Sequence, residues 1–274
     1  VALGFNRAKS YAAVNKAIIT ATGDLTVEAA MDGNTTVYIT SVVAGSVAVG
    51  ASVAVAQIRS ENVALIDVTG GTVKAANISV LAGTEAKPYD TEALATVVTG
   101  AAGVTAVALN FAVAINRSLN KAQAGGASGS LIAEKELKVR ADGRTKAYGI
   151  VLNAAVGGIS ANVSMVWATL SSIQEALLEG AATVTAGSLT VESVQNNSET
   201  TKRKDPVTVV IDTAKKFTKT ITPDSMAQAF IFSASASAVS ITANAAVATA
   251  DAVSRAKVNV NNIRVSGNIK VNNK

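Results

Sequence analysis

The chain contains neither cysteine nor histidine. The lack of cysteine excludes disulfides and thiol nucleophiles, and the lack of histidine excludes histidine-based acid–base catalysis and nearly all zinc sites. Cysteine-free chains are common among bacterial proteins exported across an oxidising periplasm, so this composition favours export. The chain begins at Val1 within an alternating pattern and without a signal peptide. We therefore expect a piece of a longer protein.

Proline, aromatic and charged residues are also scarce. The three prolines (Pro88, Pro206 and Pro223) lie between sequence repeats, as expected where most of the backbone forms hydrogen-bonded ladders. Aromatic residues make up 4% of the chain although hydrophobic residues make up 49%, so small residues dominate and favour thin, tightly stacked layers. The net charge of +5 is scattered, which predicts no nucleic-acid partner.

A short motif, Leu or Ile followed by any residue and Val, recurs five times. It begins at Leu25, Ile78, Leu137, Leu189 and Ile269. Each copy follows an alanine in a polar patch, and these alanines are Ala12, Ala64, Ala122, Ala176 and Ala256. The first three steps between these alanines are nearly equal, and the last step is about half as long again. This spacing indicates about five repeats of one module with loop or hairpin insertions.

The short segments of each repeat alternate like strands. In residues 72–80, Val73, Ile78 and Val80 share one face, whereas Lys74 points away from it. Residues 171–180 begin with serine and end with glycine, as helices do, but their counterparts in the other repeats are not helical in pattern. We predict a strand there.

Four long stretches carry no charge: residues 33–58, 93–116, 147–174 and 225–250. Each exceeds the roughly 20 residues that a membrane-spanning helix needs, so an integral membrane protein is the second hypothesis. Strict alternation, abundant Ser, Thr and Gly, and the strand-like other half of each repeat favour strands instead.

These patterns predict an all-β fold, a right-handed parallel β-helix (β-solenoid), in which residues 1–274 form a single segment of a larger protein. Inward valine, isoleucine and alanine would fill the interior, and outward serine, threonine, asparagine and lysine would meet water. If one coil takes about 20 residues, the chain makes roughly 11–13 coils and a rod of about 55–60 Å.

Two insertions interrupt the repeats. Residues 83–92 are expected to form an exposed loop, and residues 195–224 a basic loop or β-hairpin. The latter carries the candidate contact residues for an anionic glycan or host surface; a solvated hairpin is the alternative. These candidates are Lys202, Arg203, Lys204, Lys215, Lys216 and Lys219.

No catalytic, cofactor or metal site is expected, because the acidic residues are dispersed. Asp24, Asp67, Asp142 and Asp251 fall where corners are predicted, and turn chemistry explains them. A polysaccharide-active β-helix enzyme, the third hypothesis, would need clustered carboxylates. Paired glycines such as Gly125 and Gly126 are expected to serve turns and close packing.

The stretches at residues 23–29, 45–56, 103–118 and 187–193 resemble leukotoxin-type, filamentous-haemagglutinin-like large repeat adhesins of diderm bacteria. The resemblance implies secretion through a partner pore or fused translocator, β-helical stalks and display at the cell surface, with no catalytic residues. The leading hypothesis is therefore a non-enzymatic, extracellular structural or adhesive segment of a surface or fibre-forming protein. End-to-end stacking into filaments, without membrane insertion, is expected of it.

Overall fold

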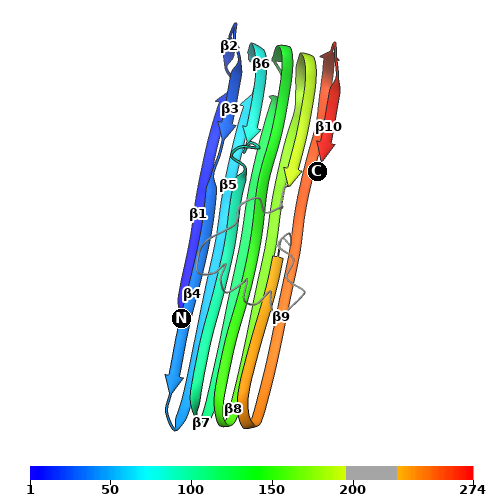
Figure 1. The fold of residues 1–274 in the computed structure, drawn as a ribbon. Helices are drawn as coiled ribbons and strands as arrows, with labels where there is room; N and C mark the ends of the chain where they lie inside the picture. The colour runs from blue at the N-terminus through cyan, green and yellow to red at the C-terminus, as the bar shows by residue number, and fades with distance from the viewer. Residues whose placement is uncertain (196–226, 274) are drawn as a thin grey trace.

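The computed structural model describes residues 1–195 and 227–273. This part of the chain forms β-strands and contains no helix. The strands are β1 (Ala2–Asn15), β2 (Ile18–Thr20), β3 (Leu25–Ala29), β4 (Asp32–Ala44), β5 (Val47–Asp67), β6 (Thr72–Ala82), β7 (Tyr89–Gly126), β8 (Ser130–Gln195), β9 (Ala227–Val265) and β10 (Ile269–Asn273). They form one 10-stranded sheet in which the pairs between different strands are all parallel (Figure 1). The predicted all-β, parallel fold is confirmed, and it is consistent with a β-solenoid.

The sheet register matches the alignment of the repeats. Ala12 pairs with Ala64, Ala64 with Ala122, Ala122 with Ala176, and Ala176 with Ala256. Each equivalent residue therefore lies beside the next along the sheet. The alternation within repeats is strong enough to fix this register, because a slip by one residue would move every side chain to the opposite face.

Each coil of the chain consists of two long arms that meet at both ends. β7 runs beside β4 through residues 90–102 and then returns beside β5 through residues 105–125. Meanwhile β1 lies beside β5, and β2 and β3 lie beside β6. One coil thus takes a whole repeat. The prediction of a coil of about 20 residues is therefore wrong. The long dimension of the molecule follows the strands (Figure 1).

Two names describe these arms below. The β4 arm comprises residues 32–44, 90–102, 144–156 and 227–237. The β5 arm comprises residues 47–67, 105–126, 159–180 and 239–260, and β1 extends it by one strand. The described part of the chain contains no helix long and apolar enough to cross a membrane.

One end of the molecule, which we call the apolar end, has an interior of large aliphatic side chains. It is built from β2, β3, β6 and the parts of β8, β9 and β10 that pair around them. Val73, Ile78 and Val80 are fully buried there, as the alternation predicted. Lys74 points outward and forms an ion pair with Glu134 at 3.1 Å.

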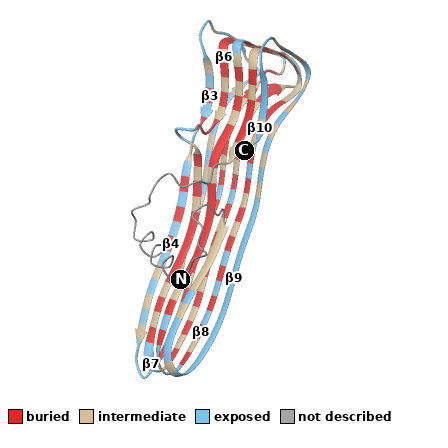
Figure 2. Ribbon diagram, turned by 45° about the vertical axis from the view of Figure 1, so that its right-hand side comes forward, coloured by how far each residue is buried: buried red, intermediate tan, exposed pale blue. Residues whose placement is uncertain are grey.

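The β5 arm has the opposite arrangement. The even-numbered residues of 48–58, 106–116 and 160–170 face inward and are buried, and most are Ala, Ser or Asn (Figure 2). The expectation that Val would point inward and Ser and Asn outward is therefore wrong for the β5 arm, whereas Val37, Val97 and Val151 of the β4 arm do point inward. Alternation shows that a strand has two unlike faces, but it does not show which face lies inside.

Polar side chains join the two arms across the interior at equivalent positions of three successive coils. Thr99 Oγ1 donates to Asn110 Oδ1 at 2.6 Å, and Ser233 Oγ donates to Asn244 Oδ1 at 3.2 Å. Asn153 Nδ2 donates to Ser164 Oγ between them. These small polar side chains let the arms approach closely, and each pair shares one hydrogen bond, although Asn110 Nδ2 and Asn153 Oδ1 are buried without a partner.

Asparagines also hold the junction between the arms and the apolar end. Asn120 Nδ2 donates to the main-chain oxygens of Ala82 and Asp142, both at 3.0 Å. Its Oδ1 accepts from Asn62 Nδ2 at 2.8 Å in the next coil. Because Asn62 and Asn120 are fully buried, these bonds replace the hydration that folding removes.

The sequence predicted that Tyr89 lies in an exposed loop, and this prediction is wrong. The loop ends at residue 88, and β7 begins with Tyr89, which is fully buried. Its hydroxyl shares a hydrogen bond with Ser60 Oγ. Burial raises the pKa of the Tyr89 phenol to about 12, although hydrogen bonds from neighbouring hydroxyls oppose the shift.

Residues 171–180 lie in β8, so the predicted strand is confirmed. The last residue of this segment, Gly180, makes a close contact with another glycine. Gly180 has a φ of +119°, and a Cβ there would lie 2.2 Å from the main-chain oxygen of Gly126. The paired glycines therefore serve tight packing at the corners, as expected.

Candidate functional site

The predicted basic contact residues cannot be placed. Lys202, Arg203, Lys204, Lys215, Lys216 and Lys219 lie outside the described residues. Within the described residues, three surface features carry enough charge or apolar area to act as sites. They are a charged network near β10, a row of arginines, and an apolar sheet face.

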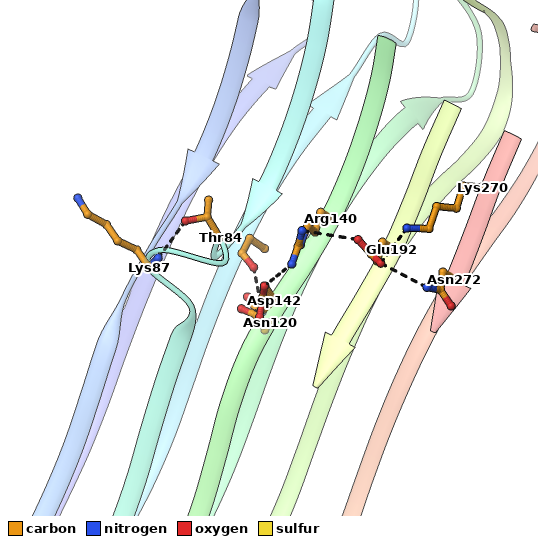
Figure 3. A network of polar contacts seen from close by, with 9 residues as sticks. Thr84, Lys87, Asn120, Arg140, Asp142, Glu192, Lys270 and Asn272 are labelled. Atoms are coloured by element: carbon orange, nitrogen blue, oxygen red, sulfur yellow. Dashed lines mark hydrogen bonds and ion pairs between the residues drawn. The ribbon is translucent and has the colours of Figure 1, made fainter. Parts of the chain in front are cut away.

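The charged network joins three neighbouring coils (Figure 3). Arg140 bonds to Asp142 at 2.7 Å and lies 3.6 Å from Glu192. Lys270 and Asn272 contact the other oxygen of Glu192 at 3.4 Å and 3.3 Å. Both carboxylates are almost fully buried, so their charges depend on these cations and donors.

A pocket of about 340 Å³ opens beside this network and is also lined by Glu85 and Arg144. The buried carboxylates that line this pocket are already ion-paired. The geometry therefore favours a structural role, in which the network holds successive coils in register. The prediction that Asp142 and Asp251 serve turns is wrong. Asp142 lies within β8 and pairs with Arg140, and Asp251 lies within β9. No group of three or more acidic side chains arranged to hold a metal ion occurs among residues 1–195 and 227–273.

A row of arginines crosses the β5 arm. Arg7 pairs in register with Arg59, and Arg59 with Arg117. All three side chains point outward and are exposed, and none forms an ion pair within the described chain. Like charges on directly opposed residues repel, at a spacing of about 4.8 Å between strands. Guanidinium groups in such a row suit carboxylate, sulfate or phosphate groups.

An apolar sheet face begins immediately beside the arginine row. We define the apolar outer face as the odd-numbered residues of 47–57, 105–115, 159–169 and 239–249. They point outward because the even-numbered residues between them face inward. Twenty of these 24 residues are apolar and none is charged, which sets this face apart from an ordinary solvated surface.

Both features could have been found from the repeat alignment. Arg7, Arg59 and Arg117 each stand five residues before an anchor alanine, so aligned repeats place them in one row. The apolar outer face needed one further fact, namely that the small residues face inward. That fact follows from packing between the arms rather than from any single strand.

Comparison with protein-family models, curated proteins and solved structures gave no match to this chain.

Proposed function

We propose that this chain is a structural segment of an extracellular bacterial surface or fibre-forming protein, built as a right-handed β-solenoid of about five coils. Each sequence repeat forms one coil, and the longer last step between anchor alanines contains the insertion. The single observation that carries this proposal is the parallel register that passes without reversal from β1 to β9. Such a ladder extends by adding coils, whatever surface it displays.

The two end coils support growth by stacking. β1 pairs only with β5, and β9 pairs with β8, so each leaves one backbone edge open within the described chain. Open edges of parallel strands can pair with a further strand. An added coil, from the same chain or another, would continue the same ladder.

Equivalent positions of the two end coils are also complementary. Through the register, Arg7 is equivalent to Asp251, and Ser10 to Ser254. If β9 of one chain pairs with β1 of the next, Asp251 lies directly opposite Arg7. The inward serines Ser10 and Ser254 then also meet in one row.

A charge exchange tests this stacking. Asp251→Arg would place two arginines together at each junction, and we expect filaments seen by electron microscopy to become rare. Adding Arg7→Asp restores an opposite pair and should restore the filaments. Both residues are exposed, so circular dichroism should remain of β type throughout. Filaments that are equally abundant in all variants, or absent from the unmodified chain, would contradict end-to-end stacking.

Adhesion is the second part of the proposal and follows from the arginine row. An anionic glycan would neutralise Arg7, Arg59 and Arg117 together, since each donates in a fixed fork. We expect the triple substitution to Gln to abolish retention on a heparin column at low salt. The matched control replaces three lysines by Gln in the same way. These are Lys9, Lys121 and Lys257, which lie farther along the same arm. Equal loss of retention in both variants would contradict a role specific to the arginines.

A further inference from the structure

The apolar outer face leaves large side chains in solvent. Trp167, Met165 and Val163 lie on successive outward positions and are 49%, 45% and 38% exposed. Val247 and Ile241 continue the face on the neighbouring strand and are 44% and 63% exposed. Sheets bury an apolar face against another layer, and this face has no second layer within the described chain.

The size of the face matches a protein interface. Four strands at about 4.8 Å and six outward rows at about 6.7 Å give a flat area of roughly 19 Å by 40 Å, or about 750 Å². This is larger than the apolar patches of about 300–600 Å² on ordinary monomers. It is close to the roughly 800 Å² that each partner contributes to a stable protein pair.

We propose that the apolar outer face binds the same face of a second copy of this chain, so that two solenoids pack side by side. A flat sheet is self-complementary, and two such sheets pack about 10 Å apart with their strands nearly aligned. A two-fold axis across the strands places the arginine rows of the two copies at opposite margins. No arginine then faces another, and no charge enters the interface.

The charge distribution favours a second copy over a lipid bilayer. Basic residues border the face along one margin only, at Arg7, Arg59 and Arg117. The opposite margin is the glycine-containing connection between the arms, at residues 45–46 and 103–104. A face that lies in a membrane interface is expected to carry basic residues around its polar margin as a whole. Lateral pairing is also independent of end-to-end stacking, because the two use different surfaces.

Trp167 allows a direct test, because it is the only tryptophan of the chain and lies within the face. We would measure acrylamide quenching of its fluorescence across a dilution series, together with mass by light scattering. A single chain has a mass of 27.5 kDa, and the pair has twice that mass. The proposal predicts pairs with a protected Trp167 at high concentration. On dilution, the mass should halve while quenching increases severalfold.

Lysine substitutions locate the interface. Val55→Lys with Val163→Lys should give single chains with an accessible Trp167 at every concentration. The control, Val42→Lys with Val156→Lys, adds the same charge to exposed positions of the β4 arm and should still pair. The stacking variant Asp251→Arg should also retain lateral pairs, which separates this interface from the ends of the solenoid.

Three outcomes would overturn the proposal. One is a single chain with fully accessible Trp167 at high concentration. Another is equal dissociation of the face and control variants. The third is protection of Trp167 only by phosphatidylglycerol vesicles, which would identify a membrane as the occupant. If the lysine variants fail to fold, the dilution series of the unmodified chain still decides between pairing and its absence.

Discussion

The apolar end and the β5 arm belong to one sheet but place their large apolar residues on opposite sides of it. At the apolar end, Val80 and Leu137 are buried, and charged residues such as Lys138 face outward. In the β5 arm, Ser52 and Asn110 are buried, whereas Val49 is exposed. The same alternation therefore buries the large aliphatic residues at the apolar end, and mainly alanine, serine and asparagine in the β5 arm.

The difference shows how interior width selects side chains. The apolar end encloses space that aliphatic side chains fill at normal packing density. The interior between the arms holds mostly small residues and asparagines, with a few larger apolar side chains such as Ile58, Val97 and Leu170. Large apolar residues are then left on the outside of the β5 arm, where burial requires a partner. Stability should therefore depend on the apolar end, and association on the arms.

The largest predicted effect separates these two regions by the same kind of change. Leu137→Ala removes a fully buried side chain at the apolar end and should lower the free energy of unfolding by about 2–5 kcal/mol. Val163→Ala, on the apolar outer face, should change it by less than about 0.5 kcal/mol in the single chain. Urea unfolding at low protein concentration measures both. Equal losses would contradict the division of roles.

The polar interior should be the next most sensitive region. Asn120→Ala leaves the main-chain oxygens of Ala82 and Asp142, and the amide of Asn62, without their partner. We expect a loss of about 2–3 kcal/mol by urea unfolding, because these groups are buried. Asn15→Ala, an exposed control at the end of β1, should be nearly neutral. A neutral Asn120→Ala would show that the buried bonds add little.

Tyr89 should make the fold sensitive to alkali. The folded pKa of about 12 exceeds the ordinary value of 10. The contribution of the neutral phenol is therefore fully present below pH 10 and is lost as the pH rises toward 12. The loss amounts to about 2–3 kcal/mol at most.

A comparison with Tyr89→Phe isolates this effect from other titrating groups. The variant should be about 1 kcal/mol less stable than the unmodified chain at pH 7, because it lacks the hydrogen bond with Ser60. That difference should shrink or reverse between pH 10 and pH 12. Parallel pH profiles of unfolding free energy for the two chains would contradict the assigned role of Tyr89.

The smallest effect is expected for the exposed charges of the β5 arm. Lys9 and Glu61 form an ion pair at 2.6 Å, but their side chains are 73% and 46% exposed. Lys9→Gln should therefore cost no more than about 0.5 kcal/mol, and less in high salt. A loss comparable to that of Leu137→Ala would show that surface pairing, rather than the apolar end, stabilises the fold.

The sequence predicted the parallel register, because the repeats carry equivalent alanines such as Ala12 and Ala64. It also predicted the inward face at Val73, where a strand with one apolar face lies beside a turn. It did not predict the length of the coil, since alternation looks the same in a short strand and in a long arm. The inward face of Ser52 and Asn110 was missed because it depends on the opposite arm. The arginine row was accessible from the repeats, whereas the buried Tyr89 was hidden by its loop-like neighbours.

A distance between the first and last coils tests most directly whether one repeat forms one coil. Lys9 and Val253 occupy the same outward row, four sheet steps apart, and the absence of native cysteine permits clean spin labelling of Lys9→Cys with Val253→Cys. Pulsed electron spin resonance, on labelled chain diluted with unlabelled chain, should give a distance of about 19 Å. A distance near about 58 Å, as expected for some 12 short coils, would contradict the flat two-arm coil.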